Sequence, residues 1–297
     1  MANMMNNGII EGVLAEIDLQ ERVWNGSDVI SGKVVVRVKA PIVKGGPVVE
    51  CDTPVQFFTK KLTNSGNPNP SYNDVSTILH EGKSIATVGE ADADGVRLTG
   101  IRVTMNDYYG RDGRYISFPR INGSFIRVVP KSQLNPVAKV DLDLIIRDMK
   151  HEVDKDGIET GRFFINGINI GFNDYTDIIP IVTENPEYIA SIGAVYQPGD
   201  AITASVRLNF TQKTTTTYQE VEIGEPIERT RTVTVSDLVI AAISRNDRIV
   251  EMYSSEQVKA CLEKRNQRIE GKKMASQQSA NAERTQNVAQ SRIDLGF

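Results

Sequence analysis

The sequence is poor in the residues that build disulfide frameworks, metal centres and membrane spans. Its two cysteines, Cys51 and Cys261, lie far apart in the chain, which argues against a disulfide framework and fits a reducing compartment. His80 and His151 are its only histidines, too few for a cluster of zinc ligands. No apolar run approaches the roughly 20 residues of a transmembrane helix, and the first residues do not resemble a signal peptide. We therefore expect a cytoplasmic protein without a membrane partner.

The sequence also lacks the motifs of catalysis. It contains no glycine-rich phosphate loop, no nucleophile elbow and no acid–base set that includes histidine. The acid pairs Asp92/Asp94 and Asp141/Asp143 fall in a predicted turn and at a predicted strand edge. We therefore expect no enzymatic activity, no cofactor and no metal.

The composition is that of a globular protein with room for two domains: 297 residues, of which 40% are hydrophobic and 24% charged. The formal net charge of -4 gives no sign of a nucleic-acid partner. The charge is unevenly distributed, however, because residues 97–131 carry seven basic side chains against two acidic ones. This basic segment includes the stretch YYGRDGRYISF, in which tyrosines and arginines are interleaved.

Short β-branched runs separated by Gly, Pro and Asn predict an all-β architecture in the first half of the chain. One segment differs, because Val75, Ile78 and Leu79 have helical spacing and Gly82 follows, which predicts a helix over residues 71–82. The predicted strands are 9–18, 33–39, 53–60, 84–90, 97–105, 114–119 and 124–129.

The second half repeats this order of elements. Strands are predicted over 138–149, 160–170 and 176–183, followed by a helix from Pro186 to about Val195. Two local echoes support a duplication: SGKVVV at 31–36 matches TGRFFI at 160–165, and GKSI at 82–85 matches GDAI at 199–202. The proline-containing stretch 130–136 is a suitable linker. The predicted domains are two modules over 1–130 and 137–253 and a C-terminal region over 254–297.

A five-stranded barrel with one helix between its third and fourth strands is the OB arrangement. The predicted fold is therefore all-β with short helices: two tandem OB-fold-like barrels, an extended β-ribbon, a C-terminal helix and a flexible tail. The ribbon spans residues 201–242 and could wrap DNA or clasp a neighbouring subunit. The helix is predicted over 255–270, ended by Gly271, with the tail over 272–297.

Residues 8–129 resemble the single-stranded-DNA-binding proteins of bacteria and especially of bacteriophages. The resemblance is carried by EGVLAEIDLQERVWNG, the following helix, GKSIATVGEA and YYGRDGRYISF. It implies sequence-non-specific binding and protection of single-stranded DNA in replication or recombination, by a homo-oligomer in the cytoplasm, the host cytoplasm if the chain is phage-encoded.

The end of the chain also resembles that family. Asp294, Leu295 and Phe297 are similar to the acidic-hydrophobic tip by which bacterial single-strand binders recruit replication and recombination proteins, although Arg292 and Gly296 depart from the pattern. The alternative interpretation of this segment is an ordinary disordered end.

A protein that holds single strands without reading sequence needs cations for phosphates and flat rings for bases on one face. Alternation along a strand buries about half of the aromatic rings, so one of Tyr108 and Tyr109 is expected in the core, and Phe118 and Phe125 are expected inside. The candidate nucleic-acid-binding residues are Trp24, Arg37, Phe57, Tyr108, Tyr109, Arg111, Arg114, Tyr115, Arg120, Arg162, Phe164, Arg207 and Lys213. The alternative function is a structural or assembly protein of a virion or tail, built from tandem β modules.

Overall fold

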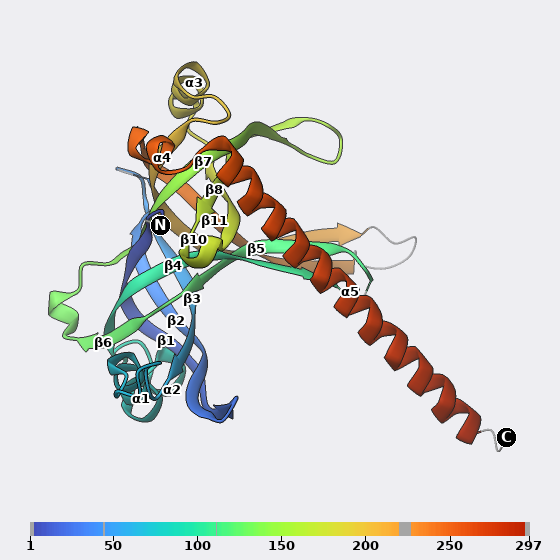
Figure 1. The fold of residues 1–297 in the computed structure, drawn as a ribbon. Coiled ribbons are helices and arrows are strands. Elements are labelled where there is room, and N and C mark those ends of the chain that lie inside the picture. The colour runs from blue at the N-terminus through green and yellow to red at the C-terminus, as the bar shows by residue number, and fades with distance from the viewer. Residues whose placement is uncertain (1–2, 44, 111, 220–226, 295–297) are drawn as a thin grey trace.

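The computed structural model describes residues 3–43, 45–110, 112–219 and 227–294; the side chains of 212–219, 227–234 and 278–294 lie outside the description. Most of these residues form strands, and a long helix follows them at the C-terminal end (Figure 1). The predicted all-β class with short helices and a C-terminal helix is confirmed.

The first half forms a closed ring of strand pairings. Strand β1 pairs with β2, β2 with β3, β3 in parallel with β5, β5 with β4, and β4 again with β1, which is the strand order of an OB fold. Helix α1, Pro70–Glu81, lies between β3 and β4 and buries Val75 and Ile78. The strands are β1 Asn6–Trp24, β2 Ser27–Pro41, β3 Val48–Lys60, β4 Gly95–Tyr109 and β5 Tyr115–Asn122, with β6 Phe125–Val129 added beside β4.

The second half repeats these pairings. Strand β7 pairs with β8, β8 with β9, β9 in parallel with β11, β11 with β10, and β10 again with β7. Helix α3, Pro186–Val195, takes the place of α1 between the third and fourth strands of this ring. The strands are β7 Val137–Val153, β8 Glu159–Ile170, β9 Thr176–Thr183, β10 Ala201–Gln219 and β11 Ile227–Arg245.

The two rings join along the N-terminal part of β1. Residues Asn6 to Glu11 pair with Leu142 to Val137 of β7, while Gly8 to Val13 pair with β4 on the other edge of the strand. One continuous hydrophobic core runs through both rings. Gly8 allows this crossing, because a Cβ atom there would lie 2.2 Å from the Lys139 carbonyl oxygen. In Figure 1 the first ring occupies the lower part of the molecule and the second ring the upper part.

The C-terminal helices pack over both rings. Helix α4, Asp247–Met252, and the start of α5, Ser255–Asp294, bury Ile249 and Cys261 in a second, smaller core. Further along, α5 crosses β4 and β9 (Figure 1). There Arg265 donates to Asp107 of β4 at 3.1 Å, and Arg268 donates to Asp177 of β9 at 3.3 Å. The helix therefore ties the two rings together a second time.

Both acids of this contact are buried, with exposed fractions of 2% for Asp107 and 4% for Asp177. Asp107 also accepts hydrogen bonds from the Tyr115 and Ser117 hydroxyls at 2.6 and 2.7 Å. Burial raises the pKa of Asp177, while the Met105 amide and Arg268 oppose the shift. We call Asp107, Asp177, Arg265 and Arg268 the α5 clamp.

Two predicted elements are wrong. Residues 84–90 were expected to form a strand, but Ile85–Val88 forms the short helix α2, because Ser84 and Thr87 exchange the hydrogen bonds of a capping box. The predicted end at Gly271 is also wrong, because α5 continues to Asp294. A glycine inside a helix costs only about 1 kcal/mol relative to alanine, which the helix-forming Lys, Ala and Gln residues around it offset.

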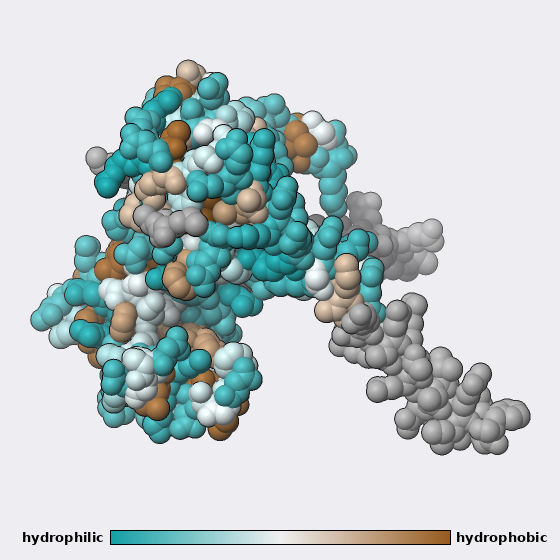
Figure 2. All heavy atoms as spheres, viewed as in Figure 1, coloured by the Kyte–Doolittle hydropathy of each residue, from teal (hydrophilic) through white to brown (hydrophobic). Residues whose placement is uncertain are grey.

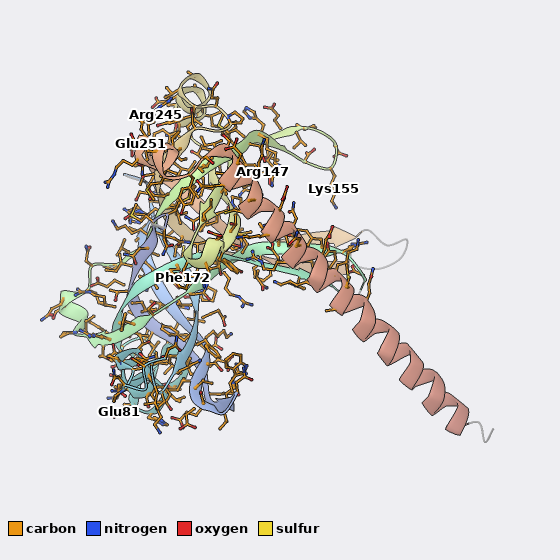
Figure 3. The ribbon with its side chains drawn as sticks, in the orientation of Figure 1. Glu81, Arg147, Lys155, Phe172, Arg245 and Glu251 are labelled. Carbon is orange, nitrogen blue, oxygen red and sulfur yellow. The ribbon has the colours of Figure 1, made fainter. Side chains whose placement is uncertain are left out.

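Two short 3-10 turns complete the fold, Lys131–Gln133 between the rings and Phe172–Asp174 between β8 and β9. Figure 3 shows Glu81 at the end of the molecule formed by α1, Glu251 of α4 near the opposite end of the molecule, and Lys155 at the tip of the β7–β8 hairpin. Within the described residues, no helix has the length and apolar character that a membrane crossing requires.

Gly8→Ala is expected to lower the free energy of unfolding by about 1–3 kcal/mol, because its methyl group would collide with β7 where the rings join. Gly193→Ala in α3 is the matched control: its Cβ meets no atom within 4 Å, and we expect a gain of up to about 1 kcal/mol. Urea unfolding measures both, and equal midpoints would contradict the close crossing.

Arg265→Ala is expected to cost about 3–5 kcal/mol, because it leaves the buried Asp107 carboxylate without its cation. Lys264→Ala on the same helix is the control: the Lys264 side chain in its ion pair with Asp174 is 61% exposed, so we expect a much smaller loss than for Arg265→Ala. A similar loss for both variants in urea unfolding would show that the α5 clamp carries no special stability.

Candidate nucleic-acid interface

A groove of about 540 Å³ crosses the outer face of the first ring where β3 and β5 meet. These two strands share a single parallel pair, Gln56 opposite Asn122, so their outer faces diverge on either side of it. The volume lies in the range of ordinary ligand sites. The strand face and the adjoining loops are where OB folds bind oligonucleotides. The lining includes Asp18, Gln20, Arg22, Ser31, Gly32, Gln56, Phe58, Arg120 and Asn122.

Gly32 of β2 is a lining residue of the groove. Its φ of 142° is one that glycine adopts readily, and a Cβ atom there would lie 2.0 Å from the Asp18 carbonyl oxygen. A side chain at this position would force β1 and β2 apart. Gly32 therefore allows β1 and β2 to pair closely beside the groove.

Two exposed aromatic rings form a pair of which one member, Phe58, lines the groove. Trp24, the last residue of β1, and Phe58 of β3 are 44% and 49% exposed and make an edge-to-face pair with ring centroids 5.3 Å apart. The Lys60 ammonium lies 5.8 Å from the centre of the Trp24 ring. This arrangement offers two rings and a cation to the same ligand.

Phe57, one of the predicted contacts, is a lining residue of the groove, but its ring is only 3% exposed and belongs to the core, whereas the ring of the neighbouring Phe58 is 49% exposed. The reason is the alternation of side chains along β3, which sends adjacent residues to opposite faces of the sheet.

Arg22 of β1 and Arg120 of β5 are exposed and stand on opposite walls of the groove. Within the described part of the chain, neither guanidinium has an ion-pair partner. Both charges therefore remain available to phosphate groups. Arg120 was among the predicted contacts, but Arg22 was not. Arg22 lies two residues before Trp24 on the same strand, a spacing that places Arg22 and Trp24 on the same face.

Two other predicted arginines are already neutralised. Arg37 lies among Glu50, Asp52 and Glu90, and its hydrogen bonds to Asp52 and the nearby carboxylates raise its pKa. In the second ring, Arg162 pairs with Glu152, Glu184 and Asp237 and covers the Phe164 ring at 5.0 Å. These residues do not lie in the groove, and neither does the half-buried Arg207 of β10.

The tyrosines of residues 108–115 have divided roles. Tyr108 is 40% exposed and makes an edge-to-face pair with Phe118. The Tyr115 hydroxyl donates to Asp107, and burial together with this carboxylate raises its pKa. Tyr115 thus supports the α5 clamp, with Tyr109 packed 5.5 Å from its ring. Arg114 is 85% exposed and pairs with Asp112 beside the β4–β5 turn.

Phe118 and Phe125, which were expected inside, are 39% and 38% exposed. Phe118 lies on β5, which extends with β4 past the ring as an arm (Figure 1), and Phe125 is the first residue of the short strand β6, so alternation alone does not bury either ring. Arg111, Leu295, Phe297 and the side chain of Lys213 lie outside the described residues. Asp294 is the last residue of α5.

The face drawn in Figure 2 is mainly hydrophilic, and its hydrophobic residues form separate small patches. This face therefore offers polar surface to a ligand, with isolated apolar contacts.

Two solved structures of the single-stranded DNA binding protein from Thermus aquaticus show a distant likeness to this chain. The wild-type protein has a TM-score of 0.49 and 12% sequence identity, covering 82% of this chain and 94% of its own. A deletion mutant has a TM-score of 0.47 and 13% identity, covering 83% of this chain and 96% of its own. A search of curated proteins gave no match.

One family does match, over residues 5–275, which include both rings and the clamped part of α5. The chain belongs to the YorF family.

Proposed function

We propose that this protein binds single-stranded DNA without sequence preference, through the groove of the first ring. The observation that supports the proposal best combines Arg22 and Arg120, which have no ion-pair partner among the described residues, with the exposed Trp24–Phe58 pair in an OB-ordered ring of strands. Cations for phosphates and flat rings for bases are the two requirements of such binding.

In this proposal the two kinds of group have separate tasks. Arg22 and Arg120 contact successive phosphates from opposite walls, while bases stack on the Phe58 and Trp24 rings. Stacking accepts every base because each has a flat face, so the contact carries no sequence preference.

The proposal extends along the β4–β5 arm. Tyr108 and Arg114 are exposed there, and Arg111 lies between them in the sequence, so the arm would continue the path of the strand beyond the groove.

We further propose the biological setting that the sequence implies: protection of single strands in replication or recombination, in the cytoplasm, by a homo-oligomer. The modules would span 1–130 and 137–253, followed by the C-terminal region 254–297. Asp294, Leu295 and Phe297 would recruit replication and recombination proteins.

Arg22→Ala and Arg120→Ala are each expected to weaken binding of labelled oligo(dT) and to reduce the slope of log affinity against log salt by about one phosphate contact. Arg147→Ala is the control, because this exposed arginine of the second ring pairs with Asp148, away from the groove (Figure 3). Gel shifts at several salt concentrations measure the slopes. Equal slopes in all three variants would place the phosphate contacts elsewhere, and no binding at low salt would remove the proposal.

Trp24→Ala is expected to weaken oligo(dT) binding by about 1–3 kcal/mol with nearly the same salt slope, because stacking releases no counterions. Phe172→Ala is the control, because it removes a phenyl group that is 71% exposed in the second half of the fold. This variant should keep the wild-type affinity for oligo(dT). Trp24 is the only tryptophan, so its emission should be quenched as the strand binds. Binding without any change in emission would show that Trp24 lies outside the interface.

A further inference from the structure

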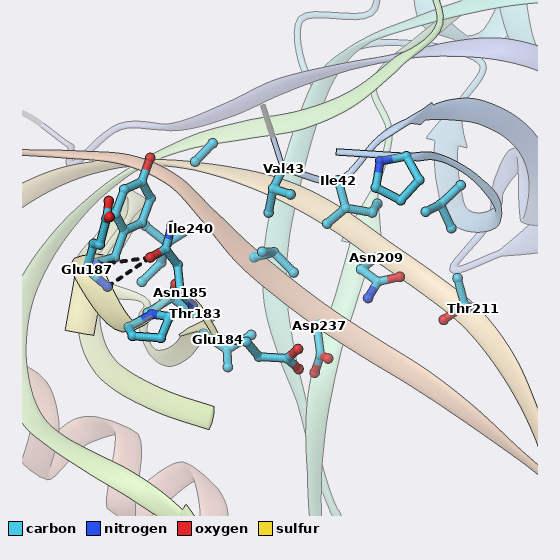
Figure 4. Close-up of a pocket in the computed structure, with 17 residues that line it drawn as sticks. Ile42, Val43, Thr183, Glu184, Asn185, Glu187, Asn209, Thr211, Asp237 and Ile240 are labelled. Atoms are coloured by element: carbon cyan, nitrogen blue, oxygen red, sulfur yellow. Dashed lines mark hydrogen bonds between the residues drawn. The ribbon is translucent and has the colours of Figure 1, made fainter. Parts of the chain in front are cut away.

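The second ring carries a groove at the equivalent place. Strands β9 and β11 meet in a single parallel pair, Val182 opposite Val239, as β3 and β5 do at Gln56 opposite Asn122. A pocket of about 950 Å³ opens over this contact, near the upper limit for ordinary ligand sites (Figure 4). The repeated topology therefore produces two comparable concave sites.

The side chains at equivalent positions have opposite chemistry. Two residues beyond the paired residue of the third strand, the first ring has Phe58 and the second has Glu184. Two residues before the paired residue of the fifth strand, the first ring has Arg120 and the second has Asp237. An aromatic ring and a cation are thus both replaced by carboxylates, which repel phosphate.

The carboxylates are in excess over the nearby cation. Glu184, Asp237 and Glu152 share one guanidinium, that of Arg162, at 3.3, 2.7 and 3.1 Å. Glu187 adds a further carboxylate to the lining. Figure 4 shows the Glu184 and Asp237 side chains on the same side of the pocket. None of the described residues that line the pocket is a lysine or an arginine.

The rest of the wall is largely aliphatic. Ile42 and Val43, which follow β2 of the first ring, close one side (Figure 4). The half-buried Val49 of β3 and Val239 of β11 extend the apolar surface. Val43 is 48% exposed, so apolar area remains open to a ligand. Since both rings contribute, this wall exists only in the assembled two-ring structure.

We propose that this second groove is a docking site for a segment of a partner protein in which arginine or lysine alternates with aliphatic residues. The basic side chains would pair with Glu184 and Glu187, and the aliphatic ones would cover Val43 and Val49. Charge complementarity selects this ligand over nucleic acid, because the carboxylate excess attracts cations and repels phosphates. The inference does not depend on DNA binding by the first ring, since the two sites share no lining residue.

The test is fluorescence anisotropy with the full chain and a labelled peptide of alternating arginine and valine. We expect saturable binding that falls about tenfold or more in a Glu184→Arg/Glu187→Arg variant, because like charges would then face each other. Both glutamates are exposed, so the variant should fold normally. Glu251→Arg, an exposed glutamate of α4 outside the pocket, is the matched control and should keep the wild-type affinity.

Three further measurements can overturn the proposal. A peptide of alternating glutamate and valine should not bind, and spermine should compete far less well than the arginine–valine peptide; equal competition would show a charge effect without apolar contacts. Unchanged peptide affinity in the Glu184→Arg/Glu187→Arg variant would exclude this pocket as the site.

DNA binding by the first groove and peptide docking in the second can be tested independently. Arg120→Ala should weaken oligo(dT) binding and leave the affinity for the arginine–valine peptide intact. The Glu184→Arg/Glu187→Arg variant should weaken peptide binding and still bind oligo(dT). Loss of peptide binding in Arg120→Ala would contradict the independence of the two grooves.

Discussion

The structure depends on one strand serving two rings. The N-terminal part of β1 pairs with β4 on one edge and with β7 on the other, and Gly8 permits the close approach of the second pair. Because a strand has only two edges, this arrangement fixes the position of each ring relative to the other. It also explains why a single hydrophobic core runs through both halves of the chain.

The α5 clamp fastens the same two rings at a different place. Burying Asp107 and Asp177 costs desolvation free energy, which is offset because Arg265 and Arg268 stand beside them and because hydroxyl and amide groups supply further hydrogen bonds. The clamp also has a consequence for ligands. The Tyr115 hydroxyl is held by Asp107 of the clamp, whereas Arg22 and Arg120 of the groove are exposed.

The two grooves illustrate how one topology can carry two sites. Each lies over the single parallel contact of a five-strand ring, where the strand faces diverge. The fold thus supplies the concavity, and the residues two positions from the contact decide its charge. In the first ring that charge is positive at Arg120, and in the second it is negative at Asp237.

The sequence by itself determined the class of fold and the repeated order of elements. The β-branched runs and the helical spacing of Val75, Ile78 and Leu79 are local signals, and they located most strands, α1 and α3 correctly. The composition also singled out Trp24 and Arg120. The failures at 84–90 and at Gly271 arose where side-chain capping and helix-forming neighbours overrode simple local signals.

Only the tertiary structure decided which predicted residues share a surface. Arg37 and Arg162 look as available in the sequence as Arg22 and Arg120, yet the first two meet carboxylates from other strands. Phe57 and Phe58 are chemically identical, and the direction of the strand face separates them. Whether a charge is free and a ring is exposed depends on which distant segments pack beside it, and strand pairing between residues far apart in the chain sets those neighbours.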